Sequence, residues 1–385
     1  MKSRMLTIFL SLLIPLGITA QEDYKDKRNF KETYVNIEKH EVLKLPVQSI
    51  PIGTMPRNII LMIGDGMGTA QLFAAYTANG RELNITSLPY SGFSTTQSAD
   101  DYITDSAAGG TALSSGQRTY NGAIAVDVDR KPIPTILEIA EKNGKATGLV
   151  SSSAITHATP ASFIAHNVSR NNYEEIAADF LKTDIDIFIG GGKSFFEERK
   201  DGRNLLKELE EKNYRIFDSI YQAANYHQLP MAILTASKHN PAYPERGDLV
   251  QEGTAKAIKA LSQHDNGYFL MVEGSQIDWG GHENNTAYII KEMLDFDKAV
   301  GKAIELAAID GETLIIVTAD HETGGMSIES GDFEKGEVQA KYTTGNHTGI
   351  MVPVFAFGPG AEYFTGVMKN TDIFYKMMTL FGFDQ

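Results

Sequence analysis

Short apolar runs alternate with amphipathic segments along most of this chain, and the alternation predicts its fold. The runs lie at residues 59–63, 146–150, 185–189, 268–272, 313–318 and 352–357. Each ends at glycine or polar residues, which is typical of a buried strand. Helical patterns lie between them, at residues 133–142, 249–263 and 286–308. Strands that alternate with helices predict an α/β fold, with a mostly parallel central sheet and helices on both faces.

Three segments depart from this alternation. Residues 193–214 are charged and have a helical pattern, and residues 329–342 predict a polar loop. Residues 218–248 are rich in Tyr, His, Asn and Pro, so we expect a small insertion that leaves the sheet there. The sequence therefore predicts a single domain at residues 51–385, preceded by a polar arm at residues 21–50.

The first 20 residues predict a secretory signal peptide. Lys2 and Arg4 precede an apolar stretch at residues 5–18, which ends in Thr19 and Ala20 before a polar segment. A retained membrane anchor is the alternative, but the stretch is short for a membrane span. We expect cleavage near Ala20, a periplasmic or secreted protein, and no membrane span after cleavage.

Composition narrows the classes of function. Among 385 residues, 42% are hydrophobic and 22% are charged, as in a globular protein with a sizeable core. Lys and Arg number 35 against 49 Asp and Glu, a net charge of -14, and no basic run provides a nucleic-acid surface. The absence of cysteine excludes disulfides, thiolate metal ligands and a cysteine nucleophile. An acidic chain that binds phosphate esters needs local positive charge, which metal ions can supply.

Acidic residues and histidines gather where the predicted strands end. Glu273 closes one run, and Asp278 and His282 follow it four apart across two glycines, on what we expect to be flexible backbone. Asp65 follows the first run between two glycines, although an aspartate there can equally cap the next helix. Asp320 and His321 follow the apolar run at residues 313–318. In α/β sheets ligands bind outside the carboxyl ends of the strands, so we expect these side chains to meet.

Hydroxyl and basic side chains follow the same rule. Ser106 comes after Asp105 and begins a predicted helix of small residues, whose N-H groups suit a nucleophile that attacks phosphate. An Asp–Ser pair before a helix is more often only a cap. His157 and Thr159 lie two apart, so they can face the same side of extended backbone. Arg170 is a candidate bidentate clamp for phosphate.

These donors predict a metal site. Aspartates together with histidines suit Zn²⁺, while an acid pair with a threonine hydroxyl suits Mg²⁺, so two or three ions are implied. We interpret His239 as non-catalytic because it has no acid partner at ligand spacing. The donors expected at this edge are Asp65, Ser106, His157, Thr159, Glu273, Asp278, His282, Asp320, His321 and His347.

A series of motifs between about residues 56 and 360 resembles the alkaline phosphatase family. They are IGDGMG (63–68), TDSAAGGTA (104–112), TYNGA (119–123), HATPASFIAH (157–166) with SR (169–170), VEGSQID (272–278), TADHETGG (318–325) and HTG (347–349). The resemblance implies a metal-dependent phosphomonoesterase with a broad substrate range, a phosphoserine intermediate on Ser106, two Zn²⁺ and one Mg²⁺, and a homodimer.

The resemblance also implies a role for each motif residue. The first zinc site would take Asp278, His282 and His347. The second would take Asp65, Asp320 and His321, beside the nucleophile and ligand Ser106. The magnesium site would take Asp65, Thr159 and Glu273, and Arg170 would clamp the substrate phosphate.

His157 and Trp279 occupy positions that vary within the family. His157 stands where some members have aspartate, so we expect a third site that is less strictly selective for Mg²⁺. Trp279 stands where others have lysine or histidine and offers phosphate no charge. We hypothesise that phosphate product inhibition is weaker than in lysine-bearing relatives. The alternative is that Trp279 only packs against the wall of the site.

Other functions of the same fold stay open at this point. A sulfatase of the superfamily would share the metal ligands, but Ser106 lies in DSAAGG, without the modification motif that sulfatases need. The motifs are also compatible with a phosphodiesterase. A non-catalytic phosphate-binding relative would keep the fold, and the intact Ser106 argues against it.

Overall fold

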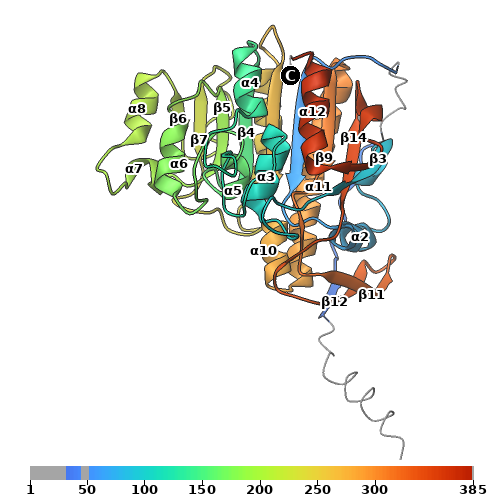
Figure 1. Cartoon of the computed structure of the whole chain (residues 1–385). Helices are drawn as coiled ribbons and strands as arrows, with labels where there is room; N and C mark the ends of the chain where they lie inside the picture. Colours follow the sequence, from blue (N-terminus) through green and yellow to red (C-terminus); the bar gives the residue numbers. More distant parts are fainter. Residues whose placement is uncertain (1–31, 45–51, 384–385) are drawn as a thin grey trace, which may run out of the picture.

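The computed structural model describes residues 32–44 and 52–383 and confirms the predicted α/β class. Ten strands of the described residues form one sheet (Figure 1). Their order is β15 (Gly366–Lys369), β3 (Tyr90–Thr95), β14 (Val352–Phe357), β9 (Thr313–Thr318), β2 (Asn58–Gly64), β8 (Tyr268–Gly274), β4 (Ala146–Ala154), β5 (Ile187–Gly191), β7 (Met231–Leu234) and β6 (Arg215–Phe217). β14 alone is antiparallel to its neighbours β3 and β9, so the sheet is mostly parallel, as predicted.

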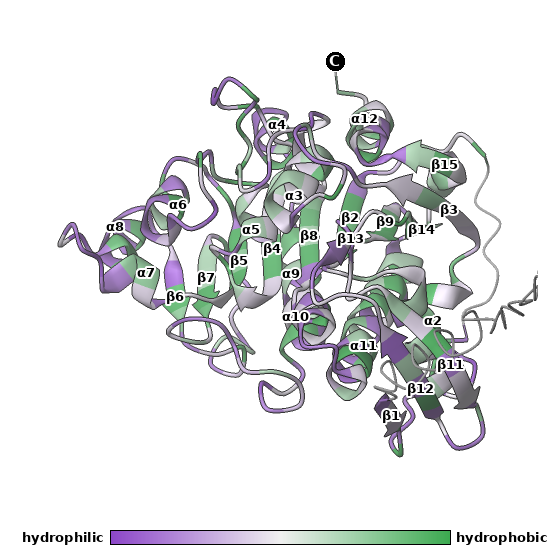
Figure 2. Ribbon diagram, turned by 60° about the horizontal axis from the view of Figure 1, so that its bottom comes forward, coloured by the Kyte–Doolittle hydropathy of each residue, from purple (hydrophilic) through white to green (hydrophobic). Residues whose placement is uncertain are grey.

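Two apolar cores enclose the sheet, one on each face. The pleat of β2 sends Ile60 and Met62 into the first core and Ile59, Leu61 and Ile63 into the second. The first core is covered by α2 (Thr69–Ala78), α9 (Leu249–Leu261) and α11 (Thr286–Asp310). The second is covered chiefly by α3 (Ser106–Ser115), α4 (Ile136–Lys142) and α12 (Asn370–Phe381). Figure 2 shows the hydrophobic strands of the centre between these layers.

Shorter elements complete the domain. They are α5 (Ala158–Ala161), α6 (Tyr173–Asp179), α7 (Ser194–Glu197), α8 (Leu205–Glu211), α10 (Gln276–His282), η1 (Ile85–Ser87) and η2 (Ala361–Phe364). The helical pattern at residues 193–214 is divided between α7 and α8. Among the described residues, no helix combines the length and the apolar character needed to cross a membrane.

Residues 329–342 are not the polar loop that we predicted. β11 (Met326–Asp332) and β12 (Glu337–Tyr342) form an antiparallel hairpin, to which β1 (Glu32–Val35) adds a third strand. The hairpin's exposed face is polar, and only Val338 and Ala340 are fully buried, so the apolar signal is weak. β1 is the described part of the predicted arm. The predicted signal peptide at residues 1–20 and the rest of the arm at 21–31 and 45–50 lie outside the described residues.

The predicted insertion at residues 218–248 is wrong for its central part. Met231–Leu234 forms β7, which pairs in parallel with β5 and β6 in the main sheet. Its four residues are all buried, but the run is too short to stand out among polar neighbours. The strand matters for the site, because the chain that leaves β7 returns to the edge where the other strands end.

Candidate active site

The central strands end at the same edge of the sheet. Register pairs Ile63 of β2 with Glu273 of β8 and with Thr318 of β9, so the residues that follow these strands emerge together. Asp65 and Asp320 are therefore brought next to Glu273. All three are buried. We refer to Asp65, Glu273, Asp278 and Asp320 as the acidic cluster.

Asp278 and His282 lie on helix α10 and not on the flexible backbone that we expected. The four-residue spacing places both on one face of that helix, with His282 Nε2 at 3.3 Å from Asp278 Oδ2. His347 Nε2 is 3.5 Å from Asp278 Oδ1. The loop after β2 comes close to helix α10 because residue 66 is glycine, with φ of +74°. A Cβ at Gly66 would lie 2.7 Å from Asp278 Cα.

Backbone carbonyls orient the two histidines of this first group. His282 Nδ1 is 2.7 Å from the carbonyl of Gly345, and His347 Nδ1 is 2.9 Å from that of Thr104. A carbonyl only accepts, so each Nδ1 donates to it and each Nε2 is left to face the Asp278 carboxylate or a metal ion. This is how metal-binding histidines are held. The Nε2 atoms of both point at Asp278.

A second donor group surrounds the Ser106 hydroxyl. His321 Nε2 lies 3.4 Å from Asp65 Oδ1 and from Asp320 Oδ2, and 3.1 Å from Ser106 Oγ. All four residues are buried. Helix α3 reaches Asp320 because it has no side chain at Gly109, where a Cβ would lie 3.1 Å from Asp320 Cβ.

Asp105 caps helix α3 and also holds Arg170. Its Oδ1 accepts from the N-H of Ala108 at 2.9 Å, which fixes the N-terminus that begins at Ser106. Its Oδ2 accepts from Arg170 Nη1 at 2.9 Å and from the N-H of Gly122 at 3.0 Å. Nearby carboxylates raise the pKa of Arg170 despite its burial, so the guanidinium is charged.

A third group consists of Asp65, His157 and Glu273, whose ligand atoms lie within 4.8 Å of one another. Ser151 and Ser275 each donate to Glu273 Oε2 at 2.6 Å. Oε1 is left without a hydrogen-bond partner among the described residues. The serines therefore turn one carboxylate oxygen toward the site.

The residues present fit divalent cations. Buried polar atoms without a hydrogen bond are rare because each loses its hydration without compensation. Across the part of the chain that the structure describes, several such atoms converge here: both carboxylate oxygens of Asp65, Asp320 Oδ2, Glu273 Oε1, Thr159 Oγ1 and His157 Nδ1. They are oxygen and imidazole ligands of the types that Zn²⁺ and Mg²⁺ bind.

The pKa values of three carboxyl groups in the acidic cluster also indicate that positive charge is missing from the site. Burial, followed by repulsion from Asp320 and Asp278, raises the pKa of Asp65 well above its ordinary value. Burial and Asp278 raise the pKa of Asp320 to about 7. Burial also raises the pKa of Glu273. Burial acts on Asp278 too, but hydrogen bonds with His282 and His347 hold its pKa well below the ordinary value.

Aromatic rings line the site beside Arg170. Arg170 Nη2 is 3.4 Å from His157 Nε2, and the His157 ring lies 6.1 Å from the Trp279 ring, edge to face. The ring of His239 lies 5.0 Å from Trp279 and 5.5 Å from His157. Our reading of His239 overlooked this contact. His239 lies shortly after strand β7, which was not predicted from the sequence. A predicted strand there would have indicated that His239 lies near the edge where the other strands end.

The ten donors predicted from the sequence, together with Arg170 and Trp279, lie at one edge of the sheet in the structure. Thr159 enters on the short helix α5, which packs against α3 and β8. Three residues that touch the donors were not anticipated, namely Ser151, Ser275 and Thr323. Each acts on a donor through a hydrogen bond that only the folded chain creates.

The alkaline phosphatase family model matches residues 56–343 of this chain. Alkaline phosphatase 4 of Bacillus subtilis is 36% identical, over 84% of this chain and 88% of its own length. The alkaline phosphatase of Escherichia coli is 33% identical, over 85% and 86%. Streptomycin-6-phosphate phosphatase of Streptomyces griseus is 32% identical, over 85% and 90%.

Solved structures give the same answer. The alkaline phosphatase of the Antarctic bacterium TAB5 superposes with a TM-score of 0.81 at 40% identity, over 86% of this chain and 99% of that one. A His-to-Asp variant of that enzyme, with Mg bound in its M3 site, has the same TM-score at 39% identity and the same coverage. The chain thus belongs to the alkaline phosphatase family and is a phosphatase.

Proposed function

We propose that this enzyme hydrolyses phosphate monoesters through a phosphoserine on Ser106. The observation that carries the proposal is the position of the Ser106 hydroxyl. It begins helix α3, lies 3.1 Å from His321 Nε2 of the second donor group, and directly follows Asp105, which holds the Arg170 guanidinium. A nucleophile for phosphate needs such surroundings.

Different groups bind the phosphate and displace the alcohol. The free N-H groups of Arg170 and the first N-H groups of α3 bind the phosphate oxygens. Ser106 Oγ then forms a bond to phosphorus as the bond to the alcohol oxygen breaks, and the alcohol leaves with a proton. Water next displaces the serine from phosphorus, which releases inorganic phosphate and restores the Ser106 hydroxyl.

We propose Zn²⁺ in the groups Asp278–His282–His347 and Asp65–Asp320–His321, the second completed by Ser106. When bound, these ions would favour ionisation of the serine hydroxyl and of water and would neutralise charge on the entering and leaving oxygens. We propose Mg²⁺ at Asp65, Thr159 and Glu273. His157 adds a nitrogen donor there, so Zn²⁺ should compete at this position better than at an all-oxygen site.

The substrate range follows from what the site grips. Arg170 and the helix N-terminus would contact the phosphate group, which all monoesters share, and the partly exposed ring of Trp279 beside them has no charge with which to select the alcohol. We therefore propose a broad monoesterase. Secretion or export to the periplasm and a homodimeric state are proposed from the sequence motifs and the family.

Trapping of the intermediate tests the proposal. The metal-loaded enzyme is mixed with an aryl phosphate labelled in its phosphate group, quenched at low pH and digested. Label is expected on the peptide that contains Ser106. Ser106→Ala should carry none and should lose at least about 10³-fold in turnover. Ser115→Ala is the matched control, because the hydroxyl of this buried serine, at the other end of the same helix, bonds only backbone groups: it donates to the carbonyl of Thr111 and accepts from the N-H of Gln117.

The same preparation separates the alternatives. A chelator should abolish turnover, and Zn²⁺ with Mg²⁺ should restore it. Aryl monoesters should react faster than the corresponding diesters, and sugar and nucleotide monophosphates should all be substrates. Preference for the diester, or absence of label on Ser106 in an active enzyme, would overturn the proposal.

A further inference from the structure

Thr323 connects two of the donor groups. It lies two residues after His321, in the short strand β10 (Glu322–Thr323), and is fully buried. Its Oγ1 is 2.5 Å from Asp278 Oδ1 and 3.2 Å from His321 Nδ1. Asp278 belongs to the first donor group and His321 to the second. One hydroxyl thus touches a candidate ligand of each group.

The proton positions in this bridge follow from its chemistry. A hydroxyl carries one proton, and a carboxylate only accepts. The Thr323 hydroxyl therefore donates its proton to Asp278 Oδ1. Thr323 Oγ1 then has only lone pairs to offer His321, so His321 carries its proton on Nδ1 and donates it. The free lone pair of His321 consequently lies on Nε2, which faces Ser106 Oγ at 3.1 Å.

The backbone holds this hydroxyl in place. The N-H of Thr323 donates to the carbonyl of Gly66, and its own carbonyl accepts from Gln71 Nε2 at 2.7 Å. β10 pairs with β13 (His347–Thr348), where Thr323 lies opposite His347. The side chain packs against Gly281, where a Cβ would lie 2.8 Å from Thr323 Cβ. The bridge is therefore set by the fold before any ion binds.

We infer that the Thr323 hydroxyl is a positioning group for both zinc sites, because it sets the tautomer of His321 and orients the Asp278 carboxylate. The inference rests on the proposed function, since it requires His321 and Asp278 to be ligands. Without the hydroxyl, His321 can place its proton on Nε2, where it blocks ligation. Hydrogen bonds to metal ligands change metal affinity by about 10- to 100-fold.

Zinc titration of the metal-free protein against a chromophoric chelator tests this without any assay of turnover. Thr323→Val keeps the size of the side chain and removes the hydroxyl, whereas Thr323→Ser keeps the hydroxyl. The two tightest zinc equivalents should bind about 10- to 100-fold more weakly to Thr323→Val. Thr323→Ser should bind them with an affinity close to that of the wild type.

Two controls make the result decisive. Thr254→Val removes a buried hydroxyl that bonds the carbonyl of Val250 within α9, and it should leave zinc affinity unchanged. Thr323→Ala adds no bulk, so a loss shared with Thr323→Val cannot come from a misfit of valine. Circular dichroism shows that each variant is folded.

Two outcomes would overturn the inference while the proposed function stands. One is wild-type affinity at both sites in Thr323→Val. The other is a loss in Thr323→Ser as large as in Thr323→Val, which would show that the hydroxyl alone does not maintain the affinity. Absence of tight zinc binding in the wild type itself would instead overturn the proposed metal assignment.

Discussion

The fold buries two sets of carboxylates and neutralises them in different ways. In the first, which we call the arginine cluster, Arg246 donates to Glu292 Oε1 at 2.8 Å and to Asp295 Oδ2 at 2.6 Å. The exposed fractions of these side chains are 2%, 1% and 0%. In the second, the acidic cluster, three of the four carboxylates have an oxygen without a hydrogen-bond partner among the described residues. The first set holds a cation of the chain among its acids, although Asp295 Oδ1 and Arg246 Nε lack a hydrogen-bond partner among the described residues, whereas the second set needs cations from outside.

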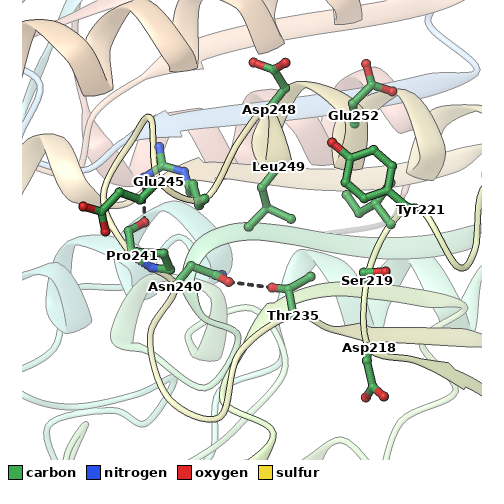
Figure 3. Close-up of a pocket in the computed structure, with 12 residues that line it drawn as sticks. Asp218, Ser219, Tyr221, Thr235, Asn240, Pro241, Glu245, Asp248, Leu249 and Glu252 are labelled. Atoms are coloured by element: carbon green, nitrogen blue, oxygen red, sulfur yellow. Dashed lines mark hydrogen bonds between the residues drawn. The ribbon is translucent and has the colours of Figure 1, made fainter.

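A cavity beside the arginine cluster shows that acidity alone does not make a metal site. It encloses about 260 Å³ and is lined in part by Asp218, Glu245, Asp248 and Glu252 (Figure 3). These carboxylates are exposed to water, so each retains its hydration. Among the described residues they form no group with ligand spacing. Burial of several oxygens that lack a hydrogen bond, and not the number of acids, distinguishes the acidic cluster.

Removal of one acid from the acidic cluster should have the largest effect. Asp320→Asn removes a ligand charge, so we expect turnover to fall by at least about 10³-fold, which corresponds to about 4 kcal/mol. The metal-free variant should be as stable as metal-free wild type or more so, because one buried like charge is gone. Turnover and urea unfolding of both metal-free proteins measure this.

Asp332→Asn, in the β11–β12 hairpin, is the control for turnover and should leave it unchanged. A marked loss of stability in metal-free Asp320→Asn would show that the N-H groups of Gly66 and His321, which donate to Asp320 Oδ1, outweigh the repulsion from the other buried acids. The contrast between the two clusters would then be wrong.

The arginine cluster should respond in the opposite way. Glu292→Gln keeps the shape of the side chain but leaves Arg246 without its bidentate partner. Breaking a buried pair in this manner costs about 3 to 5 kcal/mol of stability. Zinc affinity should stay that of the wild type wherever the variant is folded. Urea unfolding and zinc titration check the two halves, and a change in zinc affinity would mean that the clusters are coupled.

Sequence reasoning found the acidic cluster and missed the arginine cluster for a physical reason. Asp65, Glu273 and Asp320 follow strands whose apolar runs are long and continuous, and parallel strands present their ends at one edge. Arg246 and Glu292 lie on a loop and on α11, and nothing in their spacing indicates that they meet. Charges at strand ends are predictable, whereas ion pairs across elements depend on tertiary packing.

Strands, too, were predictable where the sequence carries a continuous apolar run, and were missed where it does not. β2, β8, β9 and β14 were predicted to within two residues because both faces of each are largely buried. β3, β11, β12 and β15 were missed, since each has polar or glycine positions on an exposed face. Thr323 offered one usable signal: it lies two residues after His321, a spacing that places both on one face of extended backbone.

The pH dependence of stability tests how complete the arginine cluster is. Burial raises the pKa of Asp295 to about 6, against the opposing effect of Arg246. Between about pH 4 and 6 the folded chain holds a proton that the unfolded chain has lost, so this group destabilises the fold as the pH rises through that window. Asp295→Asn should reduce the fall in stability by about 1 to 3 kcal/mol.

Urea unfolding of the metal-free proteins at about pH 4 and about pH 7 measures that difference. Other buried acids titrate in both proteins, so their contributions cancel when the two are compared. An equal fall in wild type and variant would show that Arg246 fully compensates Asp295.

A substitution at Trp279 can place a positively charged side chain beside the acidic cluster, as Arg246 already is in the arginine cluster. Trp279→Lys should strengthen inhibition by inorganic phosphate by about 3- to 10-fold, or about 0.6 to 1.4 kcal/mol. Trp279→Met, of similar length but neutral, is the control and should not do so. The inhibition constant for phosphate measures the effect. If it is the same in Trp279→Lys as in the wild type, Trp279 only packs against the wall of the site, and the bound ions already set the affinity for phosphate.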